Sequence, residues 1–170
     1  MKLTLLVSAI SMFLTLCASE LQGRVVRVAD GDTITVLDSA NVQHKVRSEK
    51  IDAPEKGQPF GKASGRYLSG LVAGREVRAA WTKRDRYNRI LGTVYLDERD
   101  INLEMLKAGF AWQYKKYDST PAESAARAAK RCLWADLDPI PPEQFRHGDH
   151  KSGGPRAKSE GSLCAEDDIS

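Results

Sequence analysis

The feature that most limits the fold of this chain is a series of short segments in which apolar and polar residues alternate. A period of two is typical of β-strands that bury one face. Two of these segments lie within residues 22–38, and Asp30, Gly31 and Asp32 separate them, so we expect a hairpin with its turn at this glycine. Three more strands are expected over residues 42–51, 75–81 and 90–95.

Three segments carry helix signals. Residues 58–73 place apolar side chains close to helical spacing, and Asp100 is a candidate N-cap for a helix that ends at Leu106. Thr120 and Glu123 match a capping box before an alanine-rich run that reaches Cys132. Five short strands, with one helix after the third and two at the end, predict an α+β fold, a five-stranded OB-type β-barrel with three helices.

Composition divides the chain into three parts. Residues 1–19 have the pattern of a signal peptide, because Lys2 precedes an apolar run over residues 3–16 that is too short to span a bilayer. Residues 20–138 carry the strand and helix patterns and are expected to form one OB-type domain. Residues 139–170 have few apolar side chains and are expected to be a mobile C-terminal tail.

The N-terminal pattern also predicts a location. Cleavage near Ala18 or Ser19 would leave the protein secreted or periplasmic. The alternative is a lipoprotein anchored through Cys17, but Leu16 is bulky at a position where such signals carry a small residue. We therefore favour export with cleavage over anchoring.

Composition excludes a chain that is disordered throughout and permits a polyanionic partner. The 170 residues are 41% hydrophobic, which is enough for one core. There are 26 Lys and Arg residues against 23 Asp and Glu residues, for a net charge of +3. The tail holds six acidic and four basic residues, so the excess positive charge belongs to residues 20–138.

Two cysteines remain after removal of the signal peptide. Cys132 and Cys164 could form a disulfide in an oxidising compartment, which would tie the tail to the last helix. The alternative is a buried Cys132 and a separate thiol in the tail. The spacing of the cysteines and histidines fits no zinc site.

Charged residues gather at two turns and at the end of a strand. Paired carboxylates with a nearby carbonyl suit a hard, oxygen-seeking cation such as Ca²⁺, Mg²⁺ or Mn²⁺. A further carboxylate can take a proton from water, and arginines bind phosphate oxygens in a bidentate manner. Together these groups can compose a site for phosphodiester hydrolysis. The residues are Asp30 and Asp32 on either side of Gly31, Arg47 before Asp52 and Glu55, and Arg89 at the end of a polar loop.

The sequence resembles the thermonuclease-like family, named for the staphylococcal nuclease, over residues 23–135. The order and the separations of the matching motifs agree with those of the family. The family has a five-stranded OB barrel with three helices, in agreement with the strand and helix patterns. The matching stretches are residues 28–33, 46–47, 51–55, 85–89, 109–112 and 133–135.

The resemblance implies a Ca²⁺ cofactor. Asp32 and Asp52 match the carboxylate ligands, the carbonyl of Ala53 matches a further ligand, and Asp30 matches a carboxylate that lies behind them.

The resemblance also implies catalytic and nucleotide-binding residues. Glu55 matches the general base or water-orienting residue, and Arg47 and Arg89 match the phosphate-binding pair. Tyr87 and Tyr117 match aromatic contacts to the nucleotide.

The implied protein is a secreted Ca²⁺-dependent nuclease, a hydrolase that cleaves phosphodiester bonds and leaves 3′-phosphate ends. Its substrate would be DNA or RNA, with a preference for single-stranded or unpaired regions. Phosphate contacts and base stacking carry little sequence information, so we expect little sequence specificity. Nothing in the sequence requires more than a monomer.

The sequence departs from the family pattern at one strand end. The family has an aliphatic residue and then a glycine between the matches to Arg47 and Ile51, whereas this chain has Ser48, Glu49 and Lys50. Alternation turns Ser48 toward the core, where a hydroxyl costs about 1 to 3 kcal/mol. We expect a complete site on a less stable barrel, so Ser48→Leu should stabilise the fold.

A different class of protein is also consistent with an OB barrel. A non-catalytic module would bind single-stranded nucleic acid or a protein partner. Such a module has no need for a base beside two metal-binding carboxylates, so the joint presence of Asp32, Asp52 and Glu55 favours the enzyme.

Overall fold

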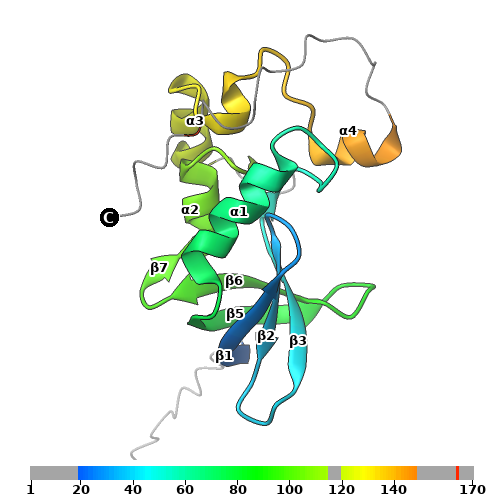
Figure 1. Ribbon diagram of the computed structural model, residues 1–170, viewed down its shortest axis with the longest axis vertical. Coiled ribbons are helices and arrows are strands. Elements are labelled where there is room, and N and C mark those ends of the chain that lie inside the picture. Colours follow the sequence, from blue (N-terminus) through cyan, green and yellow to red (C-terminus); the bar gives the residue numbers. More distant parts are fainter. Residues whose placement is uncertain (1–18, 115–119, 149–163, 165–170) are drawn as a thin grey trace, which may run out of the picture.

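A computed structural model of the chain describes residues 19–114, 120–148 and 164 (Figure 1). Residues 1–18, which contain nearly all of the expected signal peptide and Cys17, lie outside the described part. Tyr117 also lies outside it. Within the described residues, no helix combines the length and the apolar character needed to cross a membrane.

The strands form a closed barrel with helices over one end (Figure 1). The hydrogen-bonded order is β3-β2-β1-β5-β6-β7, and a parallel pairing of β3 with β6 closes the barrel. This arrangement confirms the five-stranded OB-type fold expected from the sequence. The bounds are β1 Ser19–Val28, β2 Thr33–Leu37, β3 Gln43–Ser48, β4 Ile51–Asp52, β5 Glu76–Arg84, β6 Ile90–Leu96, β7 Arg99–Asp100 and β8 Trp112–Gln113.

The strand expected over residues 42–51 is broken in two, so that prediction was wrong at its C-terminal end. Lys50 has φ 66°, which no strand residue adopts, and it separates β3 from β4. The side-chain amide of Asn102 donates to the carbonyl of Glu49 at 3.0 Å and so supports this break. Beyond it, β4 pairs with β8, which turns Asp52 away from the path of β3.

The helices are α1 Gly61–Val72, α2 Ile101–Lys107, α3 Pro121–Ala128 and α4 Pro142–His147, with a 3₁₀ turn η1 at Cys132–Ala135. The side chain of Asp100 accepts a hydrogen bond from the backbone of Leu103, so the expected N-cap of α2 is confirmed.

The capping box expected at the start of α3 does not form. The hydroxyl of Thr120 donates to the side chain of Gln113, and Glu123 instead accepts from Arg127. The helix also ends at Ala128, before Cys132, because Lys130 has φ 51°, a left-handed conformation through which an α-helix does not continue. After this end, the guanidinium of Arg131 donates a hydrogen bond to the carbonyl of Lys107.

Two clusters of buried side chains fill the molecule. The larger lies inside the barrel and beneath α1 and α2, and its fully buried members include Val36, Val46, Ile90, Ile101 and Met105. The smaller joins the β8 region to the chain after α3, where the rings of Trp112 and Trp134 meet edge to face at 5.3 Å. The helices are thus packed on the barrel from the end that carries the charged residues.

The segment assigned to a mobile tail contains a helix that packs on the domain. Pro142 is fully buried at the start of α4, and the carbonyl of Ile140 accepts a hydrogen bond from the buried side chain of Gln58. Prolines in this segment suggested a loop, but proline is favoured in the first turn of a helix. For residues 139–148 we therefore correct the domain boundary placed at Asp138.

Cys132 and Cys164 are free thiols whose side chains are hydrogen-bonded to each other. Cys132 is buried and Cys164 is partly buried. The structure therefore has the proximity expected for a pair but no bond between the sulfur atoms.

Candidate active site

The turn between β1 and β2 supplies two of the expected carboxylates. The side chain of Asp30 accepts a hydrogen bond from the backbone N–H of Asp32 at 3.1 Å. Gly31 lies between them, and a Cβ atom at this position would fall 1.9 Å from the hydroxyl of Ser64 in α1. Only glycine lets this turn pack so closely on the helix, and the packing fixes the direction of Asp32.

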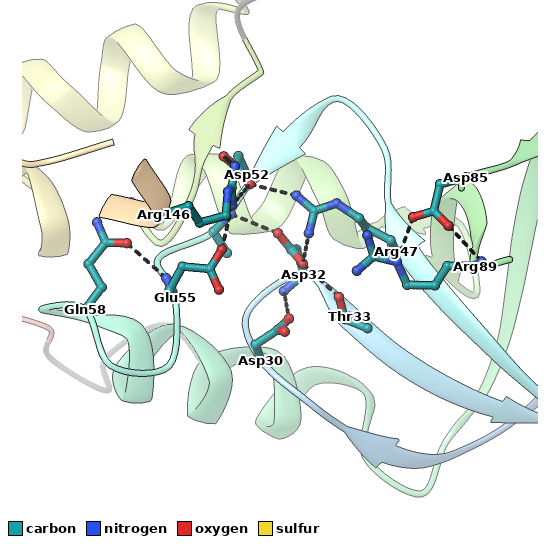
Figure 2. Close-up of polar contacts among 11 residues, drawn as sticks. Asp30, Asp32, Thr33, Arg47, Asp52, Glu55, Gln58, Asp85, Arg89 and Arg146 are labelled. Atoms are coloured by element: carbon teal, nitrogen blue, oxygen red, sulfur yellow. Dashed lines mark hydrogen bonds and ion pairs between the residues drawn. The ribbon is translucent and has the colours of Figure 1, made fainter. Parts of the chain in front are cut away.

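Arg47 joins two buried carboxylates. Its position on β3 is opposite Thr33 of β2, one residue beyond Asp32. The guanidinium donates to Oδ1 of Asp32 at 2.8 Å and to Oδ1 of Asp52 at 2.7 Å (Figure 2). The turn after β1, the end of β3 and β4 thereby meet at one point. The sequence predicts these three residues as members of one site, and the structure brings them together at Arg47.

Asp32 is the most deeply buried acid of the site. Its Oδ1 accepts from the hydroxyl of Thr33 at 2.9 Å, and its Oδ2 accepts from the backbone N–H of Ala53 at 3.1 Å. Burial raises the pKa of Asp32 to about 7, although the positive charge of Arg47 opposes this rise. A buried carboxylate of this kind is stabilised by any cation that can reach it.

Glu55 lies on the loop between β4 and α1, and its carboxylate is partly exposed. The loop is held by Gln58, whose buried side-chain carbonyl accepts from the backbone N–H of Glu55 at 3.0 Å. The expected base therefore stands beside the buried carboxylates on a segment with an internal anchor.

Arg146 of α4 is a site residue that the sequence analysis missed. Its guanidinium donates to Oδ2 of Asp52 at 2.9 Å and to Oε1 of Glu55 at 2.6 Å (Figure 2). This residue lies in the predicted tail, 91 positions after Glu55. Two prolines followed by an acidic residue before Arg146 are a helix-start signal that could have indicated an ordered segment.

Arg89 and Tyr87 lie at the end of the turn between β5 and β6. The Nε of Arg89 donates to Asp85 at 2.7 Å, and the guanidinium lies 5.4 Å from the centre of the exposed Tyr87 ring. Because β3 pairs with β6 in parallel, with Arg47 opposite Leu91, Arg89 lies two positions before the residue that faces Arg47. Arg89 is thus near the site, and it forms an ion pair with Asp85 rather than with Asp32 or Asp52.

The donor atoms of the site suit a hard divalent cation. Asp32 and Asp52 are both buried, and one guanidinium contacts both, so their carboxylates lie close together. Among the described residues, no three His, Cys, Asp or Glu side chains are grouped tightly enough to hold a metal ion by themselves. A cation here would use the two aspartates, the carbonyl of Ala53 and water, which are the oxygen donors that Ca²⁺ accepts.

A basic groove runs beside the site, between β1 and α1. It has a volume of about 640 Å³, and Asp30 lies in its wall. Four basic side chains line its wall, and none of them forms a salt bridge with an acidic side chain among the described residues. These exposed residues, which we call the groove cations, are Arg27, Lys56, Lys62 and Arg66.

Comparison with known proteins places this architecture in context. Residues 45–136 match the family described as staphylococcal nuclease homologue. An uncharacterized endonuclease of Escherichia coli is 47% identical over 137 residues, which are 78% of this chain and 88% of that protein. An uncharacterized endonuclease of Haemophilus influenzae is 49% identical over 72% of this chain and 71% of its own length. A micrococcal nuclease of Shigella flexneri is 36% identical over 75% of this chain and 82% of its own length.

Proposed function

Because this chain belongs to the staphylococcal nuclease family, we propose that it is a nuclease that hydrolyses phosphodiester bonds in DNA or RNA. The observation that carries the proposal is the junction at Arg47, which holds the carboxylates of Asp32 and Asp52 together while Glu55 stands beside them. A binding module would bury two acids at a basic groove without a use for them.

The residues of the chain divide the work of hydrolysis. Glu55 takes a proton from the attacking water or orients that water. The guanidinium of Arg47 has five N–H donors and uses one for Asp32 and one for Asp52. The remaining donors can bind phosphate oxygens. Arg89 binds the phosphate from the β5–β6 turn, on the side of the leaving 5′-oxygen, which gives 3′-phosphate products.

Ca²⁺ is the proposed cofactor. Asp32, Asp52 and the carbonyl of Ala53 would hold it, and Asp30 would support Asp32 through the hydrogen bond to its backbone. Once bound, the cation would neutralise charge on the phosphate and polarise it for attack.

The proposed substrate is single-stranded or unpaired nucleic acid with little dependence on sequence. The groove cations and the exposed ring of Tyr87 provide charge and a stacking surface, and neither reads base edges. Tyr117 is proposed as a second aromatic contact.

We further propose that the protein acts as a monomer outside the cytoplasm, after cleavage near Ala18 or Ser19. The signal-peptide pattern of residues 1–19 supports export.

The test is cleavage of denatured DNA by the mature protein, with Ca²⁺ or with chelator. We expect Ca²⁺-dependent cleavage with 3′-phosphate ends, and a loss of about 100-fold or more in rate for Glu55→Ser and Arg89→Ala. The control is Arg99→Ala, which removes an arginine that pairs with Glu104 on the surface. Binding without any cleavage by the folded wild-type protein would refute the enzyme and favour the binding module.

A further inference from the structure

The strongest feature that the proposed function leaves unexplained is Arg146. One guanidinium, delivered by a short helix near the C-terminal end of the described chain, contacts both a proposed metal ligand and the proposed base. Its Nη1 lies 3.3 Å from Oδ1 of Asp52 and 2.6 Å from Oε1 of Glu55, and its Nη2 lies 2.9 Å from Oδ2 of Asp52. A guanidinium with this geometry fixes the distance between the two carboxylates.

The contact is built into the fold through Gln58. The side-chain carbonyl of this buried residue accepts from the backbone of Glu55, and its side-chain amide donates to the carbonyl of Ile140. Gln58 thus ties the loop that carries Glu55 to the segment that leads into α4. Pro142 is fully buried at the first turn of the helix and supplies a second anchor.

The position of Glu55 on a loop leaves its side chain free to move unless another group, such as the guanidinium of Arg146, restrains it. Glu55 lies in the irregular chain between β4 and α1, and its carboxylate is more exposed than those of Asp32 and Asp52. A partly exposed glutamate samples several rotamers, and a base that points away from the attacking water does not contribute to the rate. A charge-assisted hydrogen bond from a guanidinium restricts that freedom.

We propose that Arg146 is a positioning residue of the active site, which holds the carboxylate of Glu55 at a fixed place relative to Asp52. The proposal rests on the proposed function, because it assigns Arg146 a role through the base of that reaction. It also makes α4 a part of the catalytic domain.

The first experiment measures kcat and KM on a short single-stranded oligonucleotide with saturating Ca²⁺. For Arg146→Ala we expect kcat to fall about 10- to 100-fold with KM changed by less than about threefold, because orientation of the base is lost and substrate binding is not. Arg146→Lys should recover only part of the rate, since one ammonium cannot span both carboxylates as the planar guanidinium does.

Two controls separate positioning from folding. His147→Ala alters the next residue of the same helix, and Arg127→Ala removes an arginine that pairs with a glutamate away from the site. Both variants should keep the wild-type kcat. Urea unfolding and circular dichroism of each variant record whether the fold is intact. If Arg146→Ala does not fold, Arg146→Lys carries the test, and wild-type kcat in that variant overturns the proposal.

A double-mutant cycle tests whether Arg146 acts through Glu55. Arg146→Ala in a Glu55→Gln background should lower kcat by less than about threefold, because there is no longer a base to position. An equal loss in both backgrounds would overturn the proposal.

A Ca²⁺ titration followed by calorimetry gives a readout that does not depend on turnover. We expect the Ca²⁺ affinity of Arg146→Ala to stay within about threefold of wild type. A gain of about tenfold or more, together with a higher kcat, would mean that Arg146 competes with the cation, and it would overturn the proposal. A wild-type protein that binds DNA but never cleaves it would instead refute the proposed function.

Discussion

The carboxylate of Asp32 accepts a hydrogen bond from Arg47 at 2.8 Å, yet its pKa is raised to about 7. Burial opposes the charged form of Asp32 more strongly than one guanidinium favours it, and Arg47 also serves Asp52. When no cation is bound, the ionised form of Asp32 therefore destabilises the folded protein.

The stability of the cation-free protein should depend on the ionisation of Asp32. Its pKa lies near 3.8 when unfolded and near 7 when folded, so the folded state binds the extra proton between these values. The contribution of Asp32 to the free energy of unfolding therefore falls as pH rises from about 4 to 7. Asp32→Asn lacks this loss, and we expect the variant to be more stable than wild type at pH 8 by on the order of 1 kcal/mol or more.

Urea unfolding in chelator, at pH 5 and pH 8, measures this effect. The advantage of Asp32→Asn should be smaller at pH 5, where the wild-type carboxyl is protonated. Asp38→Asn is the control, because that carboxyl is on the surface and its pKa is lowered by hydrogen bonds with His44 and Val42. Equal advantages of Asp32→Asn at the two pH values would contradict the assignment.

Local signals explain what could be predicted from the sequence. The hairpin around Gly31 and the N-cap at Asp100 depend on residues within a few positions of one another, and both form. The alternation of β3 also placed Ser48 in the core, where it is 5% exposed. The family motifs assigned Asp32, Arg47 and Asp52 to one site, whereas the contact of both aspartates with one guanidinium is seen only in the structure.

Contacts between distant segments explain what could not be predicted. The Thr120 hydroxyl is taken by Gln113, and nothing near Thr120 in the sequence indicates that partner. The role of α4 depends on Gln58, which lies 82 residues from Ile140. The prolines before α4 could indicate a helix start, but a short polar helix has no periodic pattern to show which surface it packs on, so its place in the domain depends on its tertiary contacts.

Replacement of Lys50 by glycine should stabilise the barrel. Lys50 has φ 66°, a conformation that is unfavourable for a residue with a Cβ atom and free of that strain for glycine. The gain in the free energy of unfolding should be about 0.5 to 1 kcal/mol after the larger chain entropy of unfolded glycine is counted. Asn41→Gly is the matched control, because Asn41 has φ 61° but asparagine tolerates it. A gain no larger than that of the control would show that Lys50 is not strained.

Charge reversal in the basic groove should weaken binding of long substrates. Lys62→Glu combined with Arg66→Glu changes two of the groove cations, which lie on α1. For a labelled 20-nucleotide single strand in chelator, we expect the Kd to rise about tenfold or more and the slope of log K against log salt to fall by about 1 to 2. Fluorescence anisotropy at several salt concentrations measures both.

The control for the groove is an equal charge reversal elsewhere. Lys107→Glu with Lys130→Glu changes two exposed cations that do not line the groove. This variant has the same net charge as the groove variant, so a general electrostatic effect would weaken both alike. Equal losses in the two variants would mean that the groove does not hold the strand.

Oxidation should convert the contact between Cys132 and Cys164 into a disulfide. The pKa of Cys132 is raised by its hydrogen bond with Cys164 and by burial. The same hydrogen bond lowers the pKa of Cys164. Cys164 is therefore the thiolate that attacks oxidised glutathione, and the Cys132 sulfur then displaces one glutathione thiol to close the bond. The number of free thiols per protein, titrated in urea, should fall from two to none. The two electrons reduce one oxidised glutathione to two glutathione thiols.

The resulting bond should stabilise the fold and also confine α4. It closes a loop of about 30 residues that contains Arg146, for a model-dependent gain of about 3 to 4 kcal/mol in the free energy of unfolding. Cys164→Ser, treated with the same oxidant, is the control and should show no gain. If the oxidised wild-type protein keeps both thiols, or unfolds at the same urea concentration as the reduced one, the contact is not a disulfide site. In that case α4 is held without a covalent link, through contacts that include those of Gln58, Pro142 and Arg146.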